Sequence, residues 1–240
     1  MKKISIAFCL TFAFITSTVN AQDFRIGVKG AFNSTWLFNN NVSDKGDEID
    51  YASTFSPSFG LSTILYFTEN VGVSLDLLYA TNAQKYTGKI LGVTYDASAS
   101  VKYLDIPVLF RLSSEGGPYV EIGPQIGLLM GETDEFKVSS LSIDSTKDFK
   151  NDFNSMNLAA VLGFGYDIQA NDNLFINVGL RFGYGINDVT KEYSQTEMGA
   201  TDHSLASSEA HVDATGNFNY HKTNRAFGGL MVGLIFKPGK

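Results

Sequence analysis

The chain has 240 residues, of which 18% are charged and 13% are aromatic. This composition excludes a disordered chain, because such chains are rich in charge and poor in aromatic residues. A single cysteine excludes a disulfide-stapled miniprotein and a cysteine-ligated zinc domain.

The first 21 residues have the pattern of a secretory signal peptide. Lys2 and Lys3 precede an apolar stretch at 4–15, and residues 19–21 place small side chains at the first and third positions before a cut. The apolar stretch is shorter than the roughly 20 residues that span a bilayer. The sequence therefore predicts a cleaved signal peptide at 1–21 and one exported domain at 22–240.

Without Lys2 and Lys3 the chain has 16 basic and 25 acidic residues, which is a net charge of −9. An acidic exported chain is not expected to bind nucleic acid, which requires a basic surface. No run of 18 apolar residues follows Ala21. A mature chain in a membrane would therefore have to cross it as a closed barrel.

Eight segments alternate with the period of two that is typical of strands, and they begin near residues 24, 59, 71, 103, 120, 157, 174 and 225. One face of each segment is almost entirely apolar. The opposite face carries glycine, serine and about one charged residue per strand. A soluble lipocalin-like barrel would need a charged exterior, which this second face does not supply. A soluble β-sandwich is the alternative that alternation alone leaves open.

The connections alternate in length. Short links at 68–70, 113–117 and 169–173 are separated by long ones near 39–54, 81–98, 131–154 and 187–222. Outer-membrane barrels have this arrangement of tight periplasmic turns and long outer loops. We therefore predict an all-β fold, an eight-stranded antiparallel up-and-down transmembrane β-barrel in the cell outer membrane.

Four stretches resemble one known family, in the expected order. They are YLDIPVL at 103–109, YVEIGPQIGLL at 119–129, LGFGY at 162–166 and GYGIN at 183–187. Together they resemble the outer-membrane β-barrel family that includes the PorT-like proteins. The resemblance covers Gln22 to Phe236 and implies a fold, but no common reaction. The long fourth outer loop and the tail after Phe236 depart from the pattern.

Charged residues on the glycine-rich face are expected to meet inside the barrel. A narrow charged conduit is one interpretation, and a paired polar core that plugs the barrel is the favoured one, because charges in a dry lumen need partners. The expected lumen cluster comprises Arg25, Lys29, Asp76, Asp105, Arg111, Glu121, Asp167, Arg181 and Arg225.

The three histidines, His203, His211 and His221, all fall in the fourth outer loop, and carboxylates stand beside the first two of them in the sequence. Such neighbours suit a metal site or a general base, and Ser204 or Ser208 with His211 would suit lipid hydrolysis. No catalytic motif accompanies them. We therefore expect a solvated loop, no enzyme activity, no cofactor and no metal site.

The outer loops are acidic, as suits a self-repelling surface beside anionic lipopolysaccharide. The expected role is structural or binding, in envelope integrity, adhesion or recognition. A PorT-like accessory role in outer-membrane protein secretion is the alternative that the resemblance implies, and a narrow channel comes after it. The expected partners are outer-membrane lipid, the barrel-assembly machinery during insertion, and envelope or secretion proteins.

Overall fold

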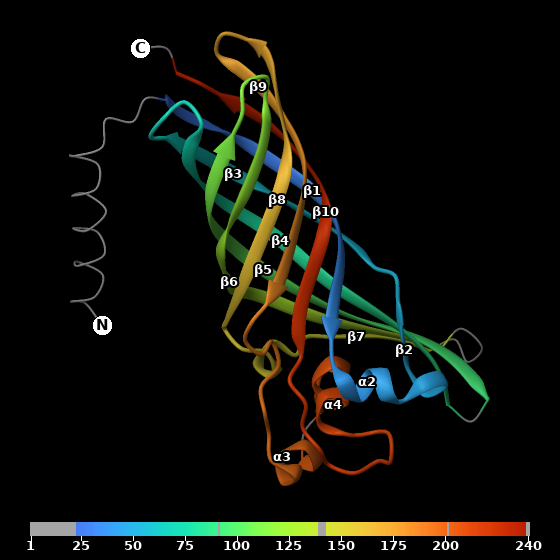
Figure 1. Ribbon diagram of the computed structural model, residues 1–240. Coiled ribbons are helices and arrows are strands. Elements are labelled where there is room, and N and C mark those ends of the chain that lie inside the picture. Colours follow the sequence, from blue (N-terminus) through green and yellow to red (C-terminus); the bar gives the residue numbers. More distant parts are fainter. Residues whose placement is uncertain (1–22, 91, 139–142, 201, 239–240) are drawn as a thin grey trace, which may run out of the picture.

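The computed structural model describes residues 23–90, 92–138, 143–200 and 202–238 (Figure 1). The expected signal peptide at 1–21 lies outside these residues. The strands are β1 (Asp23–Phe38), β2 (Asp50–Ala52), β3 (Phe55–Tyr66), β4 (Val71–Ile90), β5 (Val93–Ser113), β6 (Pro118–Val138), β7 (Ile143–Lys147), β8 (Met156–Asn171), β9 (Leu174–Gly185) and β10 (Asn224–Phe236). The helical segments are α2 (Asn40–Asp44), η1 (Gly46–Glu48), η3 (Lys150–Asp152), α3 (Gln195–Ala200) and α4 (Leu205–His211).

Eight of these strands form a closed antiparallel ring in the order β1, β3, β4, β5, β6, β8, β9, β10. The ring closes where β1 pairs with β10, from Ile26 opposite Phe236 to Phe38 opposite Asn224. The predicted fold class is therefore confirmed. β2 and β7 are additional strands that pair only with β4 and β6. Among the described helices, none is long and apolar enough to cross a membrane.

Alternation sorts the side chains into an apolar exterior and a polar interior. Val28 is 52% exposed on the outside, whereas its neighbour Lys29 is 3% exposed inside the barrel. Aromatic rings such as Phe59, Tyr166 and Phe236 also face outward. An unbroken apolar exterior on a closed barrel is the arrangement that lipid stabilises.

The two ends of the barrel differ, and we call them the turn end and the loop end. At the turn end, short links join β3 to β4, β5 to β6 and β8 to β9. The link between β5 and β6 contains Gly116 and Gly117, whose φ angles of 91° and 108° favour glycine. At the loop end, β4, β5 and β6 continue well past the other strands (Figure 1).

The expectation of a long loop at 81–98 was wrong, because β4 runs to Ile90 and β5 starts at Val93. Beyond the apolar exterior the pattern inverts. Tyr86 and Tyr95 point inward and are buried, while Lys85 and other polar residues point outward. A strand prediction that relies on an apolar outer face therefore does not detect the part of a strand that extends beyond the membrane. We call residues 81–90, 93–102 and 131–138 the wing.

The long loop expected at 131–154 is also partly strand, since β6 runs to Val138 and β7 covers Ile143–Lys147. The described remainder of the long connections folds into a compact cap at the loop end, which includes α2, η1, β2, η3, α3 and α4. Asn39 caps α2 by accepting a hydrogen bond from the Asn41 N–H at 2.9 Å. The Asn41 side chain then donates to the carbonyl oxygens of Ala210 and Asn219, at 3.0 and 2.8 Å, which ties the first loop to the fourth.

The cap shares an apolar core with the wing and the barrel mouth. Its buried members are Leu37, Val42, Ile49, Tyr86, Tyr95, Ala97, Ala99, Val101, Tyr103, Phe153, Val189 and Ala206. These side chains come from five strands or helices and from the connections between them. The loop end of the barrel is therefore covered by packed side chains.

Candidate functional site: the charged lumen and its cap

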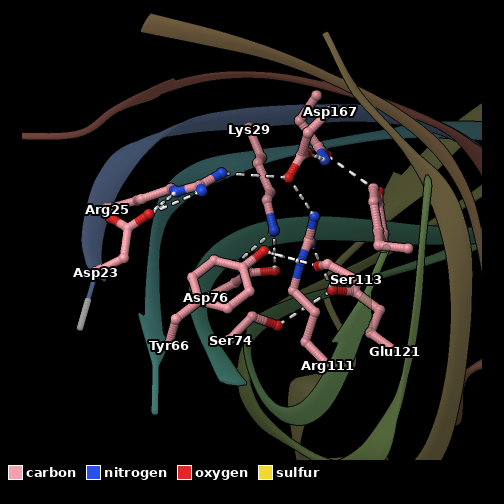
Figure 2. A network of polar contacts seen from close by, with 12 residues as sticks. Asp23, Arg25, Lys29, Tyr66, Ser74, Asp76, Arg111, Ser113, Glu121 and Asp167 are labelled. Carbon is pink, nitrogen blue, oxygen red and sulfur yellow. Dashed lines mark hydrogen bonds and ion pairs between the residues drawn. The ribbon is translucent and has the colours of Figure 1, made fainter. Parts of the chain in front are cut away.

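Each of the nine charged residues expected in the lumen lies on the inner face. Eight are less than 10% exposed, and Arg25, at the turn end, is partly buried. Figure 2 shows the cluster near the turn end, with Lys29 directed at Asp76 and Arg111 directed at Glu121. Burial of so many charges requires that they pair with one another.

Most of the cluster forms one connected network. Arg181 bridges Asp76 at 2.8 Å and Glu121 at 2.5 Å, and Lys29 pairs with Asp76 at 3.1 Å. Arg111 joins Glu121 at 3.3 Å.

The network continues from Arg111 to the turn end. Arg111 pairs with Asp167 at 2.7 Å, and Arg25 approaches the same carboxylate at 3.6 Å. Arg25 also pairs at 2.8 Å with Asp23, which the sequence analysis had not included. Asp23 brings the carboxylates of this cluster to five, equal to the five cations expected in the lumen, and it also pairs with Lys237 at 3.0 Å. Its parity, two residues before Arg25, was the signal that could have identified it.

The remaining pair lies nearer the loop end and stands apart. Arg225 binds Asp105 through both guanidinium NH2 groups, one at 2.8 Å, and donates from Nε to Asn82 Oδ1 at 2.9 Å. Between this pair and the network is a cavity of about 20 Å³, lined by Arg181 and Gln125 among others. That volume holds about one water molecule, which is too little for a hydrated ion to pass.

Glycines on the inner face make room for these long side chains. A Cβ at Gly163 would lie 2.8 Å from Glu121 Cγ, and one at Gly127 would lie 2.8 Å from Asp105 Oδ1 and 3.0 Å from Arg225 Nη1. Such distances are too short for non-bonded carbon atoms. The glycine-rich face seen in the sequence is thus the space that the ion pairs occupy.

Aromatic rings on the inner face stack on the guanidinium groups. Arg111 lies 3.5 Å from the centroid of Tyr119, and Arg225 lies 4.6 Å from that of Tyr103. At the turn end Arg25 is 4.1 Å from the Phe175 ring. Sequence reasoning did not assign these rings to the cluster, although their inward parity was readable. They reduce the cost of burying the cations by cation–π attraction.

A β-bulge places two carboxyl groups in the cap interior. The pairing of β5 with β6 shifts register between Lys102 and Tyr103, because Met130 is an extra residue on β6. Beyond it Glu132 and Asp134 point inward, with exposures of 1% and 9%. Regular alternation from Val120 would have put both on the apolar exterior. The bulge therefore redirects them, as bulges commonly do.

Glu132 and Asp134 hold cap backbone. Glu132 Oε2 accepts from the Phe149 N–H at 2.7 Å, and Asp134 Oδ2 accepts from the Leu205 N–H at 2.6 Å. Burial, which is the largest cause, and the neighbouring Asp134 carboxyl group together raise the pKa of Glu132 to about 10. This raised pKa favours the protonated form of Glu132 at neutral pH.

The histidines lie in the folded cap rather than in a solvated loop. His211 is fully buried, its Nδ1 lies 2.7 Å from the Ser207 carbonyl oxygen, and its Nε2 accepts from the Tyr193 N–H at 2.9 Å. Both ring nitrogens are thus engaged with backbone groups. His203 Nδ1 lies 3.1 Å from Asp152. Among the described residues, no group of three or more His, Cys, Asp or Glu side chains is arranged to hold a metal ion.

Several solved outer-membrane structures resemble the chain weakly. Neisserial surface protein A shares 12% identity and a TM-score of 0.39, over 90% of this chain and 97% of that one. OprG from Pseudomonas aeruginosa shares 15% identity and a TM-score of 0.38, over 92% and 97%. The protease OmpT from Escherichia coli shares 8% identity and a TM-score of 0.44, over 91% and 98%. At TM-scores below 0.5 these likenesses carry no argument about function.

A search of curated proteins found no match to the sequence. Residues 20–191, however, match the family described as outer membrane protein beta-barrel domain. This match covers most of the chain and agrees with the closed ring and its apolar exterior, and it does not single out the PorT-like type. The chain belongs to the outer membrane protein beta-barrel domain family, and its place is the outer membrane.

Proposed function

We propose that this protein is a closed, non-enzymatic outer-membrane barrel that acts through its cap, in recognition, adhesion or envelope structure. The observation that carries the proposal is that side chains fill both the lumen and its opening at the loop end. Paired charges occupy the lumen, and the apolar core shared by cap and wing covers its outer mouth. What remains available to partners is the outer surface.

The lumen supports the non-conducting part of the proposal. A passing ion would have to separate buried pairs such as Arg181–Glu121 and Arg225–Asp105. Opening a buried pair costs several kcal/mol because each partner loses its compensating charge, roughly 3–5 kcal/mol in proteins. The small cavity between the two groups does not relieve this barrier.

The cap supports the recognition part. Its loops are fixed to one another by hydrogen bonds from Asn39 and Asn41 and by the Lys45–Glu209 pair at 2.6 Å. A surface that is ordered before binding loses little conformational entropy when a partner docks. Its acidic residues, such as Asp47 and Glu48, favour a partner with a basic surface.

The buried histidine supports the absence of catalysis. Both nitrogens of His211 are occupied by backbone partners, so the ring has no nitrogen left to activate a serine hydroxyl. The non-enzymatic role would be overturned if purified protein changed the lipid profile of vesicles.

The test compares cells that lack the protein with cells that carry defined variants. Asp44→Asn, Asp47→Asn and Glu48→Gln together neutralise exposed cap acids, and Glu69→Gln with Glu115→Gln is a control at exposed positions of the turn end. We expect adhesion to fall with the cap variant alone. Recovery of detergent resistance by both variants, with no change in adhesion, would point to the envelope role. Stepwise ion conductance by purified protein in planar bilayers would overturn the closed-barrel proposal.

The finer PorT-like assignment is a second proposal, and it is based on the four stretches at 103–109, 119–129, 162–166 and 183–187. It predicts stoichiometric co-purification of secretion components with tagged protein from native membranes in mild detergent. Recovery of the barrel alone would refute it.

A further inference from the structure

The outward face of the wing carries lysines at regular intervals. On β4 the apolar exterior ends at Tyr79, and the same face continues with Lys85 and Lys89. On β5 it ends at Leu104 and continues with Lys102. Unbroken pairing of β4 with β5 beyond residue 78 sets Lys102 opposite Thr81, and Lys85 opposite Ser98. The three lysines therefore share one face that is continuous with the lipid-facing side.

These lysines have no partner within the protein. Among the described residues, none forms an ion pair or hydrogen bond with the side-chain ammonium group of any of the three. Other lysines are engaged, as shown by the Lys45–Glu209 and Lys237–Asp23 pairs. The ammonium groups of Lys85 and Lys89 are exposed and that of Lys102 is half-buried, so all three are available to an external anion.

The spacing of the lysines distinguishes two possible sources of an external negative charge, a phospholipid headgroup and a larger phosphorylated glycolipid. Their cross-strand rows are four residues apart, which is about 14 Å along a strand, so the last row is about 27 Å beyond the first. With a strand tilt of about 45° this is about 19 Å of height. A phospholipid headgroup layer is only about 5–8 Å thick. Lys102 is two residues beyond the apolar exterior of β5 and is therefore the lysine nearest the lipid, whereas Lys85 and Lys89 lie farther out along the wing, within reach of the sugars of an outer-leaflet glycolipid.

We infer that Lys85, Lys89 and Lys102 form a docking surface for the phosphorylated glycolipid of the outer leaflet. Ammonium groups bind phosphate as point charges, and the outward hydroxyls of Thr87, Ser98 and Ser100 suit sugar hydroxyls. Asp96 and Glu135 share this face. Binding therefore depends on phosphates placed near individual lysines, and it should weaken with salt. This inference goes beyond the proposed function and rests only on the location in the outer membrane.

The test measures binding of rough lipopolysaccharide, lipid A, dephosphorylated rough lipopolysaccharide and phosphatidylglycerol to purified full-length barrel in neutral detergent. In the variant K85Q/K89Q/K102Q the dissociation constant for rough lipopolysaccharide should rise about tenfold or more. The matched variant K147Q/K191Q/K222Q removes the same charge from other exposed segments and should bind as the unchanged protein does. Equal thermal unfolding of both variants confirms that they fold.

Each further probe also decides the inference. K102Q alone should weaken lipid A binding, whereas K85Q/K89Q should weaken only binding of the longer, core-phosphorylated glycolipid. The inference is overturned if dephosphorylated glycolipid binds equally well, if phosphatidylglycerol binds as tightly, or if the control variant loses as much affinity. It is also overturned if the unchanged protein retains no glycolipid.

Discussion

Replacement of Arg225 by methionine tests the paired lumen most sharply, because Arg225 and Asp105 form a pair that stands apart from the larger network. Arg225 is 1% exposed, and Asp105 is 3% exposed. In the described structure no other cation pairs with Asp105. The change therefore leaves a buried carboxylate without compensation, and it also removes the donor to Asn82 Oδ1.

The expected loss of unfolding free energy is about 3–5 kcal/mol, the usual cost of removing one partner from a buried ion pair. Most of this cost comes from the orphaned Asp105 rather than from the lost attraction. The double variant R225M/D105L removes both charges and fills the site with apolar atoms. Its stability should therefore return to within about 1–2 kcal/mol of the unchanged protein. D105L alone should also destabilise, since it leaves Arg225 unpaired.

Urea unfolding in phospholipid vesicles measures these values. Trp36 is the single tryptophan of the chain, and it lies at the outer end of β1, so its fluorescence reports the transition. The four proteins form a double-mutant cycle whose coupling free energy should exceed about 2 kcal/mol. If R225M costs less than about 1 kcal/mol, or if the double variant shows the plain sum of the two single losses, the paired-lumen argument is refuted.

The remaining predictions concern packing, pH and the cap. Gly163→Ala should lower the unfolding midpoint, because the added Cβ meets Glu121 at 2.8 Å, whereas Gly131→Ala, which meets nothing within 4 Å, should not. The raised pKa of Glu132 means that the folded cap holds a proton that the unfolded chain releases near pH 4.5, so cap stability should fall as pH rises from there towards 10. Hydrogen exchange of the fourth loop measures how cap stability changes with pH, and Glu132→Gln should remove most of this dependence. A cap stability that rises with pH over this range would contradict a protonated Glu132. His211→Ala should cost about 2 kcal/mol of cap stability, because it leaves the Tyr193 N–H without its acceptor. If limited proteolysis cuts the fourth loop no faster in this variant, the prediction is wrong.

The barrel itself could be read from the sequence because strand alternation is a local property with a period of two. Eight apolar faces, the short turns and the inward parity of residues such as Arg111 and Arg181 follow from it directly. The partners within the lumen did not follow. Arg181 lies 105 residues from Asp76 along the chain, and only closure of the ring brings the two to 2.8 Å.

Two features depended on the tertiary structure. The wing was read as a loop because beyond the membrane the outward face becomes polar, so the lysines at 85, 89 and 102 had no common face until β4 and β5 paired. The cap was read as solvated because its stability comes from contacts such as Asn41 with Ala210, which are distant in sequence. Local alternation thus determined which residues face lipid and which face the lumen. Closure and loop packing decided which charges meet, because those contacts join residues that no local pattern relates.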